Sequence, residues 1–119
     1  LQAYERMTLF MERINLSKLL VRVTSVNNDK DAYAQSLINT IDQEFEHNIA
    51  QQIYISEQCW NIIIASKNAT IHIIKKTVEL DTIKNAQELR ESIIKRMVNT
   101  TPPSSTALAF IKDEVSKFI

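Results

Sequence analysis

The sequence contains no glycine and only two prolines in 119 residues. Glycine is the residue that tight β-hairpin turns and bulges favour, because their backbone needs positive φ angles. No Asn-Gly or Asp-Gly pair is present, so the strongest sequence signal of a hairpin is absent. The lack of glycine also excludes the Walker and dinucleotide-binding fingerprints, in which glycines let the backbone approach phosphate. We therefore expect an all-α protein whose helices are joined by short polar loops.

An excess of charge of one sign is also missing. Fourteen Lys and Arg residues balance fourteen Asp and Glu residues, which gives a formal net charge of zero. Nucleic-acid-binding domains carry a clear basic patch or excess, so we expect no nucleic-acid partner. The longest uninterrupted apolar run is residues 62–65. A membrane-spanning helix needs about 20 apolar residues, so we expect no membrane span in this segment.

Cysteine is limited to Cys59. One cysteine can form no internal disulfide and no cysteine-based metal centre, which is typical of a reducing compartment such as the cytoplasm. Cys59 lies beside Trp60 at the predicted start of a helix, where a thiolate could be stabilised. No base is placed beside it by the sequence, so we interpret Cys59 as a buried structural thiol. We expect a cytoplasmic protein without a cofactor.

Apolar residues at helical spacing extend along almost the whole chain. They make up part of a 45% hydrophobic composition, which suffices for a core without disulfides. Residues 25–31, rich in Asn and Asp, and residues 99–105, which contain Pro102 and Pro103, are predicted loops. The spacing predicts helices over residues 2–14, 16–23, 32–54, 57–80 and 82–98, and a last helix after residue 104. The predicted N-caps are Ser17, Asp29 or Asp31, Ser56, Asp81 or Thr82, and Ser104 or Ser105.

The two longest predicted helices, over residues 32–54 and 57–80, should form an antiparallel hairpin, because only two or three residues join them. The first has one apolar stripe. The second has two apolar faces, which is typical of a helix that lies between neighbours. We therefore expect a bundle of five to six helices around this hairpin, with residues 1–119 forming a single domain. The stripe is Ala34, Leu37, Ile38, Ile41, Phe45, Ile49 and Ile53; the two faces are Trp60, Ile64, Ile71, Ile74 and Val78, and Ile62, Ala65, Ala69 and Ile73.

A concentrated polar stretch lies near the end of the helix predicted over residues 32–54. Glu44 and His47 are three residues apart and share a helical face, the Glu-x-x-His spacing of di-iron carboxylate bundles. Such a site needs a second element of this kind, but His72 follows Ala69 rather than a glutamate. In the expected hairpin the two histidines would also lie about 12 Å apart. The candidate interaction or polar-face residues are Glu44, His47, Asn48, Gln51, Gln52 and Tyr54.

Two interpretations of this stretch remain open at the level of the sequence. In the first, it is a polar surface on which His47 bonds to Glu44 or Gln51. In the second, Glu44 and His47 belong to a metal-dependent enzyme or metal-binding bundle. The two apolar faces of the helix over residues 57–80 indicate surplus apolar surface, and such surface marks sites of partner binding or self-association. We therefore expect a non-enzymatic protein-interaction or assembly module, with a protein partner or a second copy.

Two stretches of the sequence are similar to a known family. They are LQAYERMTLFMERI at residues 1–14 and EFEHNIAQQIYIS at residues 44–56. Both resemble a family of uncharacterised small helical proteins from Bacteroidota, a domain of unknown function, and the resemblance covers most of the chain. It implies an upstream N-terminal membrane anchor, which would make this chain a fragment that lies at the cytoplasmic side of the inner membrane. The family brings no established activity, so no catalytic residue is assigned.

Overall fold

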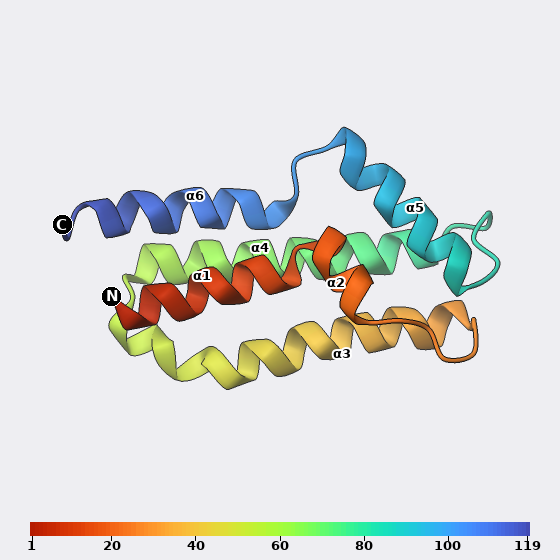
Figure 1. Ribbon diagram of the computed structural model, residues 1–119, viewed down its shortest axis with the longest axis horizontal. Coiled ribbons are helices and arrows are strands. Elements are labelled where there is room, and N and C mark those ends of the chain that lie inside the picture. Colours follow the sequence, from red (N-terminus) through yellow and green to blue (C-terminus); the bar gives the residue numbers. More distant parts are fainter.

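All regular elements of the protein are helices, as the sequence predicts. The computed structural model describes all 119 residues, and its helices form an elongated bundle of 49 × 28 × 20 Å (Figure 1). None of the helices is at once long enough and apolar enough to cross a lipid bilayer. The elements are α1 (Gln2–Ile14), α2 (Leu16–Arg22), α3 (Lys30–Asn48), the 3-10 helix η1 (Ile49–Tyr54), α4 (Glu57–Val78), α5 (Ala86–Asn99) and α6 (Pro103–Ser116).

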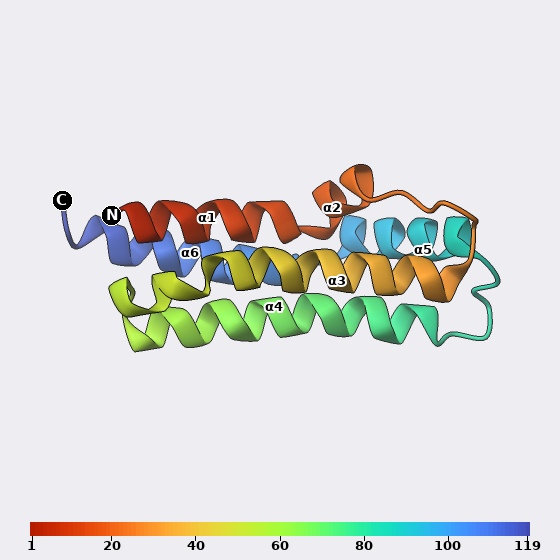
Figure 2. The same cartoon turned by 90° about the horizontal axis from the view of Figure 1, so that it is seen from below.

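The predicted antiparallel hairpin is formed by α3 and α4, which lie side by side along the length of the molecule (Figures 1 and 2). The remaining two sides of the bundle are each divided into two shorter helices. At the end that carries both chain termini, α1 packs against α6. Towards the other end, α2 packs against α5. As predicted, α4 is the central element, because it contacts α1, α3, α5 and α6.

Helix α3 is shorter than predicted, ending at Asn48 rather than at residue 54. The Asn48 amide donates a 2.8 Å hydrogen bond to the carbonyl of Glu44, and the N–H of Ile49 bonds to the carbonyl of Glu46. This three-residue spacing begins the tighter 3-10 winding of η1. The change in winding moves Ile49 and Ile53 out of the predicted core stripe, and their exposed fractions are 50% and 78%.

Helix α4 packs all of its first predicted face against the core, whereas its second predicted face does so only through Ile62 and Ile73. Ala65 and Ala69, predicted to face a neighbour, are exposed. The buried face contains hydroxyl residues that a search for apolar spacing passes over. The hydroxyls of Thr70 and Thr77 donate to carbonyls one turn earlier in the same helix, at 2.8 and 2.7 Å, so their burial leaves no donor unpaired. The buried residues of α4 are Cys59, Trp60, Ile63, Ser66, Thr70, Ile73, Ile74 and Thr77.

The start of α5 lies four residues later than the predicted range begins. Asn85 is its N-cap, and the Asn85 side chain accepts a 2.9 Å hydrogen bond from the N–H of Glu88. The loop before α3 also contributes: the carbonyl of Asn28 accepts from the N–H of Ala86, and the Asn28 side chain accepts from the N–H of Gln87. These bonds satisfy the first N–H groups of α5, which have no partner inside the helix.

Two other helix starts differ from the prediction, and two predicted caps are confirmed. Helix α6 already begins at Pro103, because proline lacks only an N–H that the first turn leaves unpaired. The cap of α2 is Asn15 rather than Ser17, whose N–H it accepts at 3.1 Å. Asp29 caps α3 by accepting from the N–H of Ala32, and Ser56 caps α4 by accepting from the N–H of Cys59.

The core runs through the middle of the bundle and draws on every α-helix. An aromatic row crosses it, with ring centroids 5.9 Å apart between Phe10 and Phe45 and 5.5 Å apart between Phe45 and Trp60. This row joins α1, α3 and α4. The largest fully buried side chains are Phe10, Met7, Met11, Ile14, Leu16, Leu19, Leu20, Leu37, Ile41, Ile63, Ile74 and Leu89.

Candidate functional site

Five of the six predicted polar-face residues line a seam between α1 and the segment formed by the end of α3 and η1. Two hollows lie along this α1–η1 seam. The first, of about 270 Å³, is lined by Glu44, His47 and Asn48. The second, of about 410 Å³, is lined by Gln51 and Tyr54. The sixth predicted residue, Gln52, lines neither hollow. The α1 residues that complete the seam are Leu1, Gln2, Ala3, Arg6, Leu9, Phe10 and Arg13.

Glu44 serves as an anchor between helices. One carboxylate oxygen accepts from the Nε of Arg13, and the other accepts from Nη2 of Arg22 at 3.3 Å. Arg22 also donates to the backbone carbonyl of Arg13 at 2.8 Å. The Glu44 side chain is only 15% exposed, so both oxygens are held by guanidinium groups in a largely shielded position. Glu44 therefore ties α3 to α1 and α2.

The metal-dependent alternative gains no support from this geometry. Both carboxylate oxygens of Glu44 are already bound to arginines, and a metal would have to displace them. No group of three or more His, Cys, Asp or Glu side chains is placed so that it could hold a metal ion. His47 lines the first hollow. The hydrogen bond to Glu44 or Gln51 that the first interpretation of the polar stretch gave to His47 is absent.

Arg6 is the residue that the two hollows share. It is exposed and, unlike Arg13 beside it, has no carboxylate within ion-pair distance. The side chains that line the hollows around it include the amides of Gln2, Asn48 and Gln51. Amide groups can donate hydrogen bonds to an anion alongside a guanidinium. The centre of the seam therefore offers an unpaired cation among groups that can donate hydrogen bonds.

Large apolar side chains surround these polar groups. Leu1 and Leu9 on α1, and Ile49, Ile53 and Tyr54 on η1, are each at least half exposed. Isolated exposed apolar residues are normal on protein surfaces. Here, however, Leu1, Leu9 and Tyr54 line the two hollows that share Arg6, and apolar surface around a polar centre is typical of interaction sites. The seam combines the two kinds of group that a protein interface uses.

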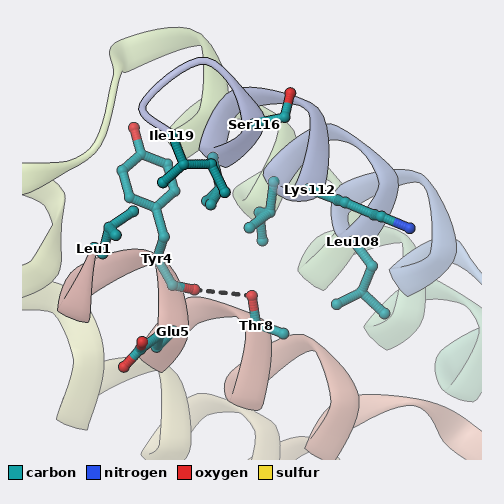
Figure 3. Close-up of a pocket in the computed structure, with 10 residues that line it drawn as sticks. Leu1, Tyr4, Glu5, Thr8, Leu108, Lys112, Ser116 and Ile119 are labelled. Carbon is teal, nitrogen blue, oxygen red and sulfur yellow. Dashed lines mark hydrogen bonds between the residues drawn. The ribbon is translucent and has the colours of Figure 1, made fainter.

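A third hollow, which the sequence analysis did not identify, lies between α1 and α6. This α1–α6 groove has a volume of about 540 Å³ and opens to solvent along the bundle (Figure 3). Its apolar lining comes from Leu1 and Tyr4 on α1, from Leu108, Ile111 and Val115 on α6, and from Ile119. The signal in the sequence was the 4-3-4 spacing of residues 108, 112, 115 and 119, which places them on one face of a helix.

A hydrogen-bonded cluster that includes Tyr4 of the groove joins three helices. The hydroxyl of Tyr4 donates to Glu114 at 2.9 Å, and it accepts from the N–H of Ser56 at 3.3 Å. The hydroxyl of Ser56 donates to the other Glu114 oxygen at 2.6 Å. Glu114 on α6 is thereby linked to α1 and to the N-terminus of α4. Burial raises the pKa of Tyr4, and its hydrogen bond to Glu114 raises it further.

Cys59 lies in the first turn of α4, close to Ser56 of this cluster, and is completely buried. Burial, followed by the negative charge of Glu114, raises the pKa of its thiol to about 11. A thiol with such a pKa stays protonated at neutral pH, and the protonated form is a poor nucleophile. The interpretation of Cys59 as a buried structural thiol is therefore confirmed.

Comparison with protein families shows to which family this chain belongs. A model described as a family of unknown function, DUF7935, matches residues 1–118. The chain belongs to this family. The predicted resemblance to an uncharacterised domain is thereby confirmed, while the Bacteroidota source and the membrane anchor remain predictions. No curated protein and no solved structure matches the chain, so membership in the family assigns no activity to any residue of the seam.

Proposed function

We propose that this chain is a non-enzymatic protein-interaction module that binds an acidic segment of another protein along the α1–η1 seam. The observation that carries the proposal is the position of Arg6 at the meeting point of two hollows, without a carboxylate partner of its own. An Asp or Glu side chain of the partner would supply the missing charge. Hydrogen bonds between charged groups are stronger than neutral ones, so this contact would set the register of the partner.

The exposed apolar residues supply the remaining part of the interface. Tyr54 is exposed and lines the second hollow, and Leu9 is exposed and lines the first. Apolar and aromatic anchors contribute most of the binding free energy in protein interfaces, whereas charges contribute more to specificity and to the rate of association. The partner is therefore expected to place apolar side chains on η1 and an acidic side chain over Arg6.

The structure offers a direct test with a matched control. Tagged protein is used to capture partners from the cells that produce it, and the captured proteins are quantified by mass spectrometry. Arg6→Glu should lower the recovery of the specific partner by about tenfold, because it replaces an attraction with a like-charge repulsion. Lys75→Glu makes the same change of charge at an exposed position in the last turn of α4, a helix that ends at the opposite end of the bundle from the chain termini. Recovery should be unchanged with this control.

A second variant tests the apolar part of the proposal. Tyr54→Asp places a charge at a position that lines the second hollow and is 68% exposed, so folding should tolerate it, while partner recovery should fall. Far-ultraviolet circular dichroism checks that each variant remains helical. If the set of captured proteins is the same for the wild type and both seam variants, the seam is not the binding site and the proposal is wrong.

The cellular context that we propose follows the sequence analysis and the family resemblance. The chain acts as one domain on the cytoplasmic side of the inner membrane, attached to it through an upstream anchor. An anchored module would present the α1–η1 seam to partners that diffuse along or near the membrane. Its partner in this arrangement is a protein, and the module needs no cofactor.

A further inference from the structure

We infer that the α1–α6 groove is the interface of a symmetric homodimer, in which the groove of one copy is covered by the same groove of a second copy. This inference goes beyond the proposed function, since it concerns a different surface and names its occupant. It depends on two features of the groove: an apolar centre that is open to solvent, and one unpaired charge of each sign on its two sides.

The apolar centre is the first feature. Leu108 and Val115 of α6 remain partly exposed beside the buried Ile111, and Leu1, Phe118 and Ile119 at the chain ends are more than half exposed. All of these side chains except that of Phe118 line one hollow of about 540 Å³. Two antiparallel helices with an apolar groove between them form half of a four-helix arrangement. A second copy with the same pair of helices would supply the other half.

The charges are the second feature. Glu5 extends from α1 and Lys112 extends from α6, and Figure 3 shows them on opposite sides of the groove. Both side chains are exposed, and neither takes part in an ion pair within the chain. Every other side chain that lines the groove is uncharged. The rim of the groove therefore has one acidic side, on α1, and one basic side, on α6.

This charge pattern is complementary to itself. In an interface with two-fold symmetry, each residue faces the partner position on the opposite side of the symmetry axis. An axis through the middle of the groove would place Glu5 of one copy against Lys112 of the other, and the same pair would form again on the other side. Complementary charges of this kind set the register of an interface that apolar contacts stabilise.

A second copy fits the groove better than a small apolar ligand does. Pockets for small ligands bury about 70–90% of the ligand surface, whereas this groove is open along its length and would leave one side of such a ligand in water. A second copy would cover the open side.

Sedimentation or light scattering measures the mass directly. The wild type should shift with concentration from 13.7 kDa to twice that mass. Glu5→Lys and Lys112→Glu should each raise the dissociation constant by about tenfold or more, because each creates two like-charge pairs in the symmetric dimer. An equimolar mixture of these two variants should dimerise again. In the mixed dimer, both pairs of facing positions carry opposite charges.

The controls separate this inference from the proposed function. Lys95→Glu makes the same charge change at an exposed position on α5 and should leave the dimer intact. Arg6→Glu, which weakens partner binding at the seam, should also leave it intact. A wild type that stays monomeric at all concentrations would overturn the inference, as would a dimer that both rim variants leave unchanged. A mixture that associates no more tightly than its two components would also overturn it, and a bound lipid detected by native mass spectrometry without dimer would assign the groove to that ligand instead.

Discussion

Asn28 shows how a single residue compensates for the absence of glycine. Its φ angle is 59°, the only positive φ in the chain. Asn tolerates this left-handed region better than most residues because its short polar side chain can bond locally. In this conformation the carbonyl and the side chain of Asn28 accept hydrogen bonds from Ala86 and Gln87, at 3.0 Å each. A turn residue thereby caps a helix that begins far along the chain.

Replacement of Asn28 should therefore cost stability. We expect Asn28→Ala to lower the free energy of unfolding by about 1–2 kcal/mol, because alanine loses the side-chain acceptor and is strained at positive φ. Asn28→Asp keeps both the acceptor and the tolerance of this conformation, so its loss should be smaller. Urea unfolding measures both variants, and the midpoint should move without a change in the slope. An alanine variant as stable as the wild type would contradict the capping role.

Sequence reasoning located the candidate residues at the end of α3 and on η1, but it could not locate their counterparts on α1. Glu44, His47, Asn48, Gln51 and Tyr54 were found because polar residues three or four apart share one face. Arg6 carries no such signal. Its importance depends on which helix packs beside η1 and on its having no carboxylate partner. Both are properties of tertiary contacts, which a pattern within one segment does not contain.

At the scale of elements, the type of every α-helix was predictable and several boundaries were not. The start of α1 and the caps of α3 and α4 followed from local rules. The end of α3 depended on the change to 3-10 winding at Asn48, where apolar Ile49 and Ile53 continue the periodicity without being buried. The apolar pattern cannot distinguish a residue in the core from one that is exposed, since both are apolar.

The attachment of α6 gives a prediction at this scale. Glu114 bonds to Tyr4 on α1 and to Ser56 at the start of α4, so it joins α6 to two neighbours. Glu114→Ala should lower the free energy of unfolding by about 1–3 kcal/mol, because it leaves the hydroxyl of the buried Tyr4 and that of the exposed Ser56 without their acceptor. Amide hydrogen exchange should rise first within α6, which Glu114 holds in place.

A matched variant separates this effect from a general loss of charge. Asp113→Ala removes an exposed carboxylate on the same helix, whose only ion pair is with Lys117 one turn away. Exposed pairs of this kind contribute about 0–1 kcal/mol, so exchange in α6 should change little. Equal effects of the two variants would show that the bonds to Tyr4 and Ser56 do not secure α6.

At the scale of the whole molecule, stability should decrease in alkaline solution because of Cys59. Its thiol has an ordinary pKa of 9.0 when unfolded, and burial raises the pKa to about 11 in the folded protein. Between these values the unfolded chain binds fewer protons than the folded one, so the free energy of unfolding falls as the pH rises. The contribution is fully present below pH 9 and is lost by about pH 11, and it amounts to about 3 kcal/mol.

The measurement is urea unfolding at a series of pH values from 7 to 12, for the wild type and for Cys59→Ala. The alanine variant is expected to be less stable at neutral pH, because it removes a buried side chain. Its stability should nevertheless fall less steeply between pH 9 and 11, since it has no thiol to ionise. Tyr4 and Tyr33, whose pKa values burial also raises, are present in both proteins, and only Tyr4 loses a minor effect that raises its pKa, that of Cys59, in the alanine variant. Parallel curves would mean that the thiol ionises as readily in the folded protein as in the unfolded chain, which is incompatible with its burial beside Glu114.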